Sequence, residues 1–135
     1  MTETHDEHTT IQEILDLNEQ LLSSIADGDW ETYAKLCDPT LTVFEPETRG
    51  QLVEGLEFHN FYFDGSGAPS RHNTTVCSPH VRLLSDDAAI LSYVRLVQRF
   101  DDSGKPATYR SEETRVWQRQ EGVWRHVHFH RSISG

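Results

Sequence analysis

Arginine side chains interrupt three otherwise apolar stretches in the C-terminal half of the chain, at Arg95, Arg115 and Arg131. Bulky residues lie two positions away from each, among them Trp117 and Phe129. A guanidinium in an apolar interior stays charged, so it must meet a carboxylate or line a pocket that accepts an anion. The residues alone leave both alternatives open. The candidate carboxylates are Glu45, Glu47, Glu112 and Glu113.

Three histidines, His126, His128 and His130, alternate along a predicted strand, and strict alternation would point all three rings to one face. Imidazoles on one face are a known way to hold zinc. A metal centre also needs a further fixed ligand and outer partners, and no second cluster with ligand spacing accompanies these histidines. We therefore predict no metal site, and we expect histidines that face solvent or an interface.

Other familiar catalytic patterns are missing from the sequence. Glu112 and Glu113 are adjacent, so a strand would point them to opposite faces, which is the wrong geometry for a paired acid and base. There is no Gly-x-Ser-x-Gly elbow, Walker loop or Gly-x-Gly-x-x-Gly motif. These observations predict neither a cofactor nor a common hydrolase site.

The N-terminal half reads as helical. Thr10 and Glu13 form a capping box, and helically spaced apolar residues then predict a helix over 10–26, before Gly28. Asp29 can cap a second short helix that ends before Pro39. A β-like run follows at 41–44, and a third helix over 52–63 is predicted to carry His59.

The C-terminal half reads as β-structure after a Gly- and Pro-containing loop at 64–70. Alternating residues predict strands at 73–84, 88–100, 107–119 and 123–131, joined by short turns. Helices followed by an antiparallel meander predict an α+β fold.

The strand at 88–100 has two apolar faces, although helices can cover only one face of a sheet. The second face is therefore expected to meet another subunit. One face carries Ile90, Val94, Leu96 and Phe100, and the other carries Ala89, Leu91, Tyr93 and Val97. Either row could form the centre of the interface, with the first as the primary candidate.

The amino-acid composition limits the binding partners and the cellular compartment that can be expected for this chain. The 135 residues suit one domain, with an acidic disordered tail at 1–9 and the folded domain at 10–135. The net charge of −10 disfavours nucleic acid and anionic membranes as partners. Two cysteines far apart in sequence and the lack of a long apolar run predict a soluble, cytoplasmic protein.

Several longer strings are distinctive in combination. They are Cys37-Asp-Pro39, Phe44-Glu-Pro-Glu47, Leu52-Val-Glu-Gly-Leu56, Phe58-His59 with Phe61-Tyr-Phe63, Ser111-Glu-Glu-Thr-Arg-Val-Trp117 and Val127-His-Phe-His-Arg-Ser132. Together they resemble one family, the association (hub) domain of calcium/calmodulin-dependent protein kinase II, within the NTF2-like/SnoaL-like superfamily. The resemblance covers nearly the whole chain from Ile11 to Ser132.

The resemblance implies an NTF2-like, cystatin-like cone, in which a curved antiparallel sheet wraps a long N-terminal helix. It also implies a homo-oligomer in which dimers, formed through the sheet, assemble into large rings. A deep pocket able to bind a small carboxylate is implied as well. Its matching residues here are Arg95, Arg115 and Arg131, with His59 and Tyr33 beside them.

The kinase motifs of that family are missing, so the resemblance points to a stand-alone hub without catalytic activity. The first predicted helix is acidic, so direct calmodulin binding is not expected. An alternative remains, because NTF2-like cones also house isomerases, cyclases and hydrolases. In that case His59 would be the base, with Glu45 as its substitute.

Overall fold

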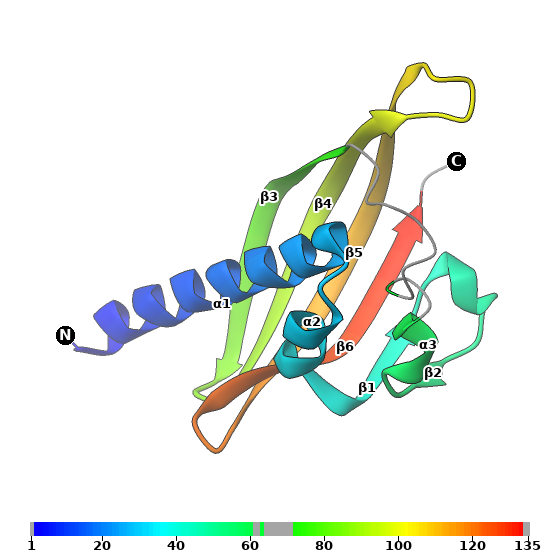
Figure 1. Cartoon of the computed structure of the whole chain (residues 1–135). Coiled ribbons are helices and arrows are strands. Elements are labelled where there is room, and N and C mark those ends of the chain that lie inside the picture. Colours follow the sequence, from blue (N-terminus) through cyan, green and yellow to red (C-terminus); the bar gives the residue numbers. More distant parts are fainter. Residues whose placement is uncertain (1, 61–62, 64–71, 134–135) are drawn as a thin grey trace.

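The computed structural model describes residues 2–60, 63 and 72–133. Helices and the shorter strands come first, and four long strands follow (Figure 1). In chain order the elements are α1 (Thr2–Asp27), α2 (Trp30–Leu36), β1 (Cys37–Phe44), the 3-10 turn η1 (Pro46–Thr48), β2 (Val53–Glu54), α3 (Glu57–Asn60), β3 (His72–Ser85), β4 (Ala88–Phe100), β5 (Pro106–Gln120) and β6 (Val123–Ile133).

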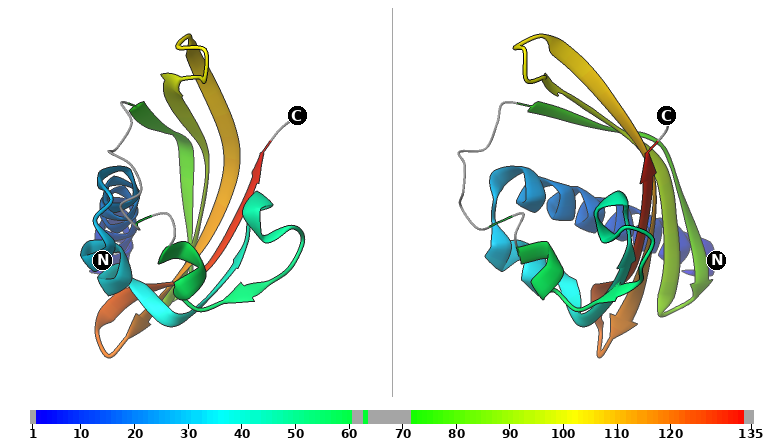
Figure 2. Two further views of the ribbon diagram at one scale, coloured as in Figure 1. Left: turned by 45° about the vertical axis from the view of Figure 1, so that its right-hand side comes forward. Right: turned by 90° about the vertical axis from the view of Figure 1, so that its right-hand side faces the viewer.

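The strands form one six-stranded sheet in the order β2-β1-β6-β5-β4-β3. Neighbours are antiparallel except β1 and β6, which run parallel. The sheet is curved, and α1 lies across its inner, concave face together with α2 and α3 (Figures 1 and 2). The predicted α+β class and the meander from β3 to β6 are thereby confirmed. No helix of the described residues is long and apolar enough to cross a lipid bilayer.

The core forms between α1 and the inner face of the central strands. Ile14 and Leu21 of α1 are fully buried, and so are Leu91 of β4 and Trp117 of β5. Alternation then sends the even-numbered residues of β4, including Ile90, to the outer face of the sheet. The odd row of β4 therefore belongs to the interior of the subunit.

The first helix is longer than predicted. The sequence suggested a helix from Thr10 after a disordered tail, whereas α1 begins at Thr2. No proline or glycine lies between Thr2 and Asp27, so no residue type in this stretch breaks a helix. The polar composition of the tail was therefore compatible with continuing the helix.

The third helix begins later than predicted. Residues 52–63 were expected to be helical, but β2 occupies the first part of this range and α3 is described as Glu57–Asn60. Residues 61–62 of the predicted helix lie outside the described residues. Val53 pairs with Val43 of β1, and the Gly55 amide donates to the Leu41 carbonyl at 2.7 Å. Gly55 has a φ of 100°, which a helix cannot contain. The predicted loop at 64–70 lies outside the described residues.

The histidine row is split between the two faces of the sheet. A register irregularity between Val116 and Trp117 of β5 lies opposite these histidines of β6. His126 pairs with Trp117 and is fully buried, whereas His128 pairs with Val116 and contacts Thr42. The prediction that His126, His128 and His130 share one face was wrong, because a bulge reverses the alternation of side chains.

Replacing Gly55 tests the role of its left-handed backbone in positioning α3. We expect Gly55→Ala to lower the free energy of unfolding by about 1–2 kcal/mol, because a Cβ disfavours positive φ. The cost is conformational, since a Cβ there would meet only the Pro39 carbonyl, at 4.0 Å. Urea unfolding measures it, with Gly55→Asn as a matched variant that should lose less. Equal stability of wild type and Gly55→Ala would contradict this account.

Candidate functional site

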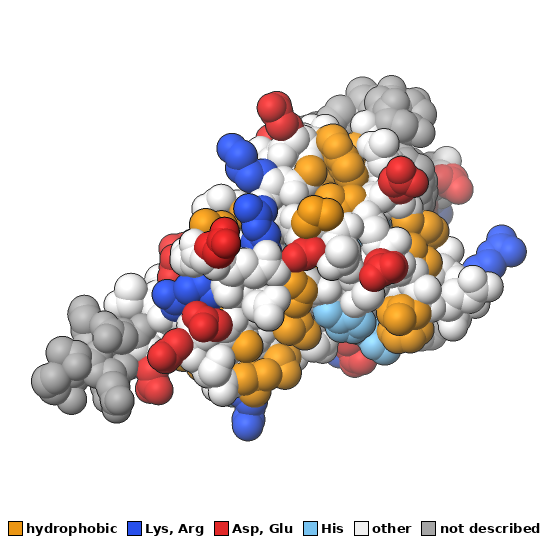
Figure 3. Space-filling model, turned by 90° about the horizontal axis from the view of Figure 1, so that it is seen from below, with side chains coloured by type: hydrophobic (Ala, Val, Ile, Leu, Met, Phe, Trp, Pro, Cys, Tyr) orange, Lys and Arg blue, Asp and Glu red, His pale blue; other side chains and the backbone are white. Residues whose placement is uncertain are grey.

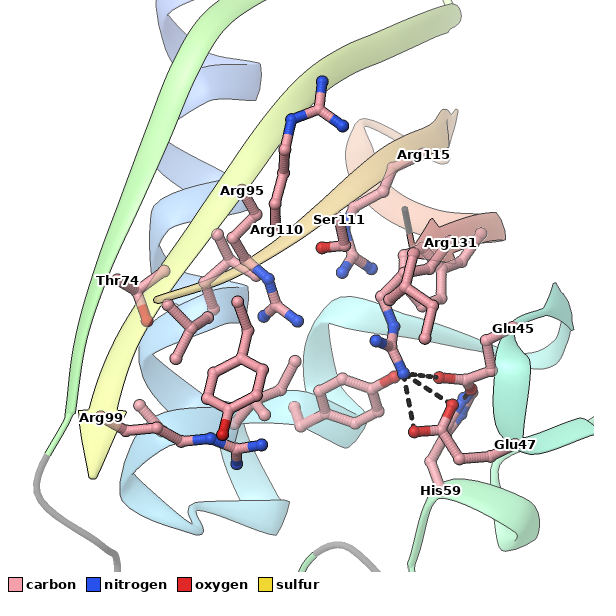
Figure 4. Close-up of a pocket in the computed structure, with 18 of the residues that line it drawn as sticks. Glu45, Glu47, His59, Thr74, Arg95, Arg99, Arg110, Ser111, Arg115 and Arg131 are labelled. Carbon is pink, nitrogen blue, oxygen red and sulfur yellow. Dashed lines mark hydrogen bonds and ion pairs between the residues drawn. The ribbon is translucent and has the colours of Figure 1, made fainter. Parts of the chain in front are cut away.

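A pocket of about 340 Å³ opens on the concave side of the sheet, between the strands and the helices (Figure 4). The sequence-predicted site residues all line it, although five different elements supply them. They are Arg95 of β4, Arg115 of β5, Arg131 of β6, His59 of α3 and Tyr33 of α2. The structure therefore brings together the full set that sequence reasoning grouped.

Glu113 forms the buried centre of the ion pairs on the sheet side of this pocket. Its carboxylate lies 2.8 Å from Arg95 Nε and 3.2 Å from Arg115 Nη2. It also accepts hydrogen bonds from the Tyr93 hydroxyl at 2.5 Å and the Ser111 hydroxyl at 3.2 Å. Burial alone would raise the pKa of Glu113, but Arg115 and Arg95 lower this pKa below its ordinary value.

Arg115 is held on every side by the protein. Besides Glu113, it donates to the Tyr93 hydroxyl at 2.9 Å and stacks 3.7 Å from the Phe129 ring centre. Its Nη1 donates to His126 Nε2 at 3.3 Å, which places the His126 proton on Nδ1, facing Cys37 Sγ. Only 1% of the Arg115 side chain is exposed. The first alternative, internal ion pairing, is therefore realised at this arginine.

Burial keeps two neighbours of Arg115, the His126 imidazole and the Cys37 thiol, in their neutral forms. Desolvation, followed by the nearby charge of Arg115, lowers the pKa of His126 well below its ordinary value. Desolvation likewise raises the pKa of the Cys37 thiol to about 12, although Arg115 opposes this shift. Neither group carries charge near neutral pH. They act as packed polar neighbours that fix the guanidinium.

The opposite wall contains a second ion-pair group. Arg131 lies 2.6 Å from a Glu47 oxygen and 3.3 Å from a Glu45 oxygen, and His59 Nε2 lies 2.8 Å from the other Glu45 oxygen (Figure 4). Burial would raise the pKa of Glu45, but His59 and Arg131 lower it below its ordinary value. Tyr33 packs edge-on against His59, with ring centres 5.9 Å apart. This wall is charged but internally paired.

Arg95 differs from the other two predicted arginines. Its Nε faces Glu113, whereas its two terminal nitrogens have no hydrogen-bonding partner within the described part of the chain. The side chain is 17% exposed and enters the pocket (Figure 4). Such a guanidinium can bind a carboxylate through two parallel hydrogen bonds.

Arg99 and Tyr109 are among the pocket residues that sequence reasoning missed. Both line the pocket, and the Arg99 guanidinium lies 4.3 Å from the centre of the Tyr109 ring. The available signal was the period of the strand, because Arg99 is four positions after Arg95 and therefore on the same face. It was overlooked because Arg99 is close to the predicted end of the strand.

The primary interface candidates lie on the opposite, outer face of the sheet. Ile90, Val94 and Leu96 are half-buried there, and Phe100 is largely exposed. Val116 of β5 lies next to Ile90 in the register. Seen from below, hydrophobic side chains lie beside histidine side chains on the surface (Figure 3). The alternative row fills the core and the pocket: Ala89, Leu91 and Tyr93 are buried, and Val97 lines the pocket.

Comparisons with known proteins agree with this architecture. Residues 10–135 match the family model described as the calcium/calmodulin dependent protein kinase II association domain. The chain is 51% identical over 134 residues to the calcium/calmodulin-dependent protein kinase type II subunit delta of Oryctolagus cuniculus. That match covers 98% of this chain but only 25% of the rabbit protein.

Solved structures give the same result. The association domain of C. elegans CaMKII has a TM-score of 0.90 and 44% identity, covering 95% of this chain and 98% of the other. The CamKII hub homology domain of Chlamydamonas reinhardtii has a TM-score of 0.86 and 47% identity, covering 93% and 99%. An NTF2-like superfamily protein of Salmonella enterica, at 22% identity and a TM-score of 0.76, shows the fold alone.

The expected NTF2-like fold is thus confirmed, and so is the expected class, an association domain. The alternative of an enzyme that uses His59 or Glu45 as a base is set aside in favour of that class. Because the family model matches residues 10–135 and the rabbit relative is 51% identical over 134 residues, this chain belongs to the calcium/calmodulin dependent protein kinase II association domain family.

Proposed function

We propose that this chain self-associates through the outer face of its sheet, forming dimers that assemble into larger homo-oligomeric rings. The observation that carries the proposal is the apolar outer face of β4 and its neighbours. All three helices pack on the inner face, so no element of the described chain covers the outer one (Figure 2). Membership of an association-domain family supports the same conclusion.

The composition of this face suits contact with a second copy. Ile90, Val94 and Leu96 of β4 offer half-exposed apolar area, and Val116 extends that area to β5. Phe44 adds an aromatic ring on the β1 side, 5.6 Å from the ring centre of His130. Apolar and aromatic residues at the centre of a patch with polar residues around it are typical of homo-oligomer interfaces.

A charge on the outer face tests the proposed interface. We expect Val94→Asp to weaken self-association by about 2 kcal/mol or more, because a buried interface would hold the new carboxylate without a partner. Sedimentation velocity measures the shift toward smaller species. Val123→Asp is the matched control, since Val123 is half-exposed near the turn between β5 and β6 and lies outside the central patch.

Circular dichroism must show that both variants keep the fold. A sedimentation profile of folded Val94→Asp that matches wild type would place the interface elsewhere. A wild-type chain that sediments as a 15.5 kDa monomer at micromolar concentration would remove the proposal altogether.

We further propose that the pocket binds a small carboxylate, with Arg95 as its main anchor. Arg115 and Arg131 support the site in different ways, because both already pair with glutamates. Arg95 shares Glu113 with Arg115, so this pair of cations has one carboxylate between them. An incoming anion would supply the missing negative charge and two hydrogen-bond acceptors.

The affinity of the pocket for an anion should depend more on the arginines that line it than on the net charge of the whole molecule. The chain carries a net charge of −10, which slows the approach of any anion. Screening by salt weakens that distant repulsion more than it weakens a contact inside the pocket. Affinity for a carboxylate should therefore depend on Arg95 far more than on ionic strength.

Calorimetric titration with butyrate tests the anchor. Arg95→Gln should weaken butyrate binding about tenfold or more, because a charged hydrogen-bond pair is lost. Arg95→Lys keeps the charge but loses the bidentate geometry, so an intermediate affinity is expected. Lys35→Gln, an exposed change on α2 away from the pocket lining, should leave binding unchanged.

Two results of the butyrate titration would contradict carboxylate binding at Arg95. If wild-type protein shows no heat of butyrate binding at millimolar concentration, the pocket is not a carboxylate site. If Arg95→Gln binds butyrate as wild type does while its thermal unfolding remains cooperative, Arg95 is not the anchor.

A further inference from the structure

The pocket extends past Arg95 toward the end of β4, where Arg99 and Tyr109 form part of its wall. Arg99 follows Arg95 by four residues, so both side chains belong to the inner face, with Cα atoms roughly 13 Å apart along an extended strand. Val97 lies between them, and its register partner on β5 is Tyr109. Figure 4 shows Arg95 and Arg99 entering the same space from the β4 side.

Arg99 is distinguished by its charge environment. Each of the other arginines in the lining has a carboxylate within ion-pair distance: Arg95 and Arg115 share Glu113, Arg110 meets Glu112, and Arg131 meets Glu45 and Glu47. Arg99 has no such carboxylate among the residues that the structure describes. It is exposed and stacks on the Tyr109 ring.

Stacking leaves the hydrogen-bonding edge of Arg99 available. A guanidinium that rests on an aromatic ring uses its face, whereas its N–H donors lie in the plane of the group. Tyr109 therefore orients the cation and spares its donors. Tyr109 is itself 40% exposed, so the pair stands at the opening of the pocket.

Two unbalanced positive charges thus lie along one wall. The first is the Arg95–Arg115 pair with its single Glu113, and the second is Arg99. Across the pocket, Arg131 already pairs with Glu45 and Glu47, and Glu45 also pairs with His59, so that wall is internally compensated. An anionic ligand is therefore expected to favour the β4 side, where the apolar Val97 lies between the two cations.

We propose that Arg99 and Tyr109 form a second anion subsite, so that the preferred ligand is an extended dicarboxylate whose ends meet Arg95 and Arg99. An apolar spacer lies over Val97, with the inner acid group on Arg95. This inference rests on the proposed carboxylate binding at Arg95 and adds the ligand class to it. It accounts for the position of Arg99, which has no ion-pair partner among the described residues, on the same strand face as the anchor.

Paired titrations separate the two subsites. Adipate is compared with hexanoate and suberate with octanoate, because each pair has equal length and differs only in the second acid group. We expect at least one dicarboxylate to bind wild type about fivefold more tightly than its matched monocarboxylate. The factor is modest because the second acid group adds one ion pair that is partly exposed to solvent.

Arg99→Gln should abolish this advantage, so that each dicarboxylate binds about as tightly as its matched monocarboxylate. Arg99→Lys should retain part of it, because the charge stays while the planar fork is lost. Lys105→Gln is the matched control: it removes one positive charge at the turn between β4 and β5, outside the pocket lining. The control should preserve both affinities.

The results distinguish the second anion subsite from the proposed carboxylate binding at Arg95. Equal affinity for both members of each pair, with binding still dependent on Arg95, overturns the second subsite alone. An advantage that survives in Arg99→Gln, or that disappears equally in Lys105→Gln, overturns it as well. Absence of binding by every probe overturns the carboxylate pocket together with its second subsite.

Discussion

The buried carboxylate of Glu113 is the interaction on which the inner face depends. Two guanidiniums, Arg95 and Arg115, enter a space from which water is largely excluded, and isolated charges there would be very unfavourable. Glu113 neutralises part of that charge, and Tyr93 links it to Arg115 through a second path. A network with these partners can remain buried, whereas removing its central acid would leave two uncompensated cations.

The same network decides which arginines remain available to a ligand. Arg115 makes contacts through every donor nitrogen and one ring face, so it serves as a fixed part of the wall. Arg95 meets Glu113 only through Nε, which holds the side chain while its terminal nitrogens point elsewhere. Three arginines of similar appearance in the sequence thus acquire different roles, because their positions relative to two groups of glutamates differ.

Periodicity was a good guide to the long strands and a poor guide to irregular positions. Beta-strand alternation placed β3 to β6 within two residues of their observed ends, since each strand carries many alternating side chains. The bulge opposite Val116 reversed that alternation at His126, and a bulge leaves little trace in a single sequence. Gly55 similarly interrupts the first part of the predicted third helix, and its hydrogen bond to Leu41 is long-range, so it has no local signal. The pocket set was grouped through family resemblance, whereas its internal pairing required the geometry.

Strand β4 joins the two surfaces for which functions are proposed. Arg95 belongs to the pocket, and its immediate neighbours, Val94 and Leu96, belong to the outer face. Consecutive side chains on a strand share one backbone but little else, so each face can change its chemistry without altering the other. The backbone position, in contrast, is common to both, and hydrogen bonds to β3 and β5 hold it along its length. A substitution that shifts this backbone must therefore disturb both surfaces, whereas one that only shortens a side chain disturbs a single surface. This constraint favours variation in side chains over variation in the length of the strand.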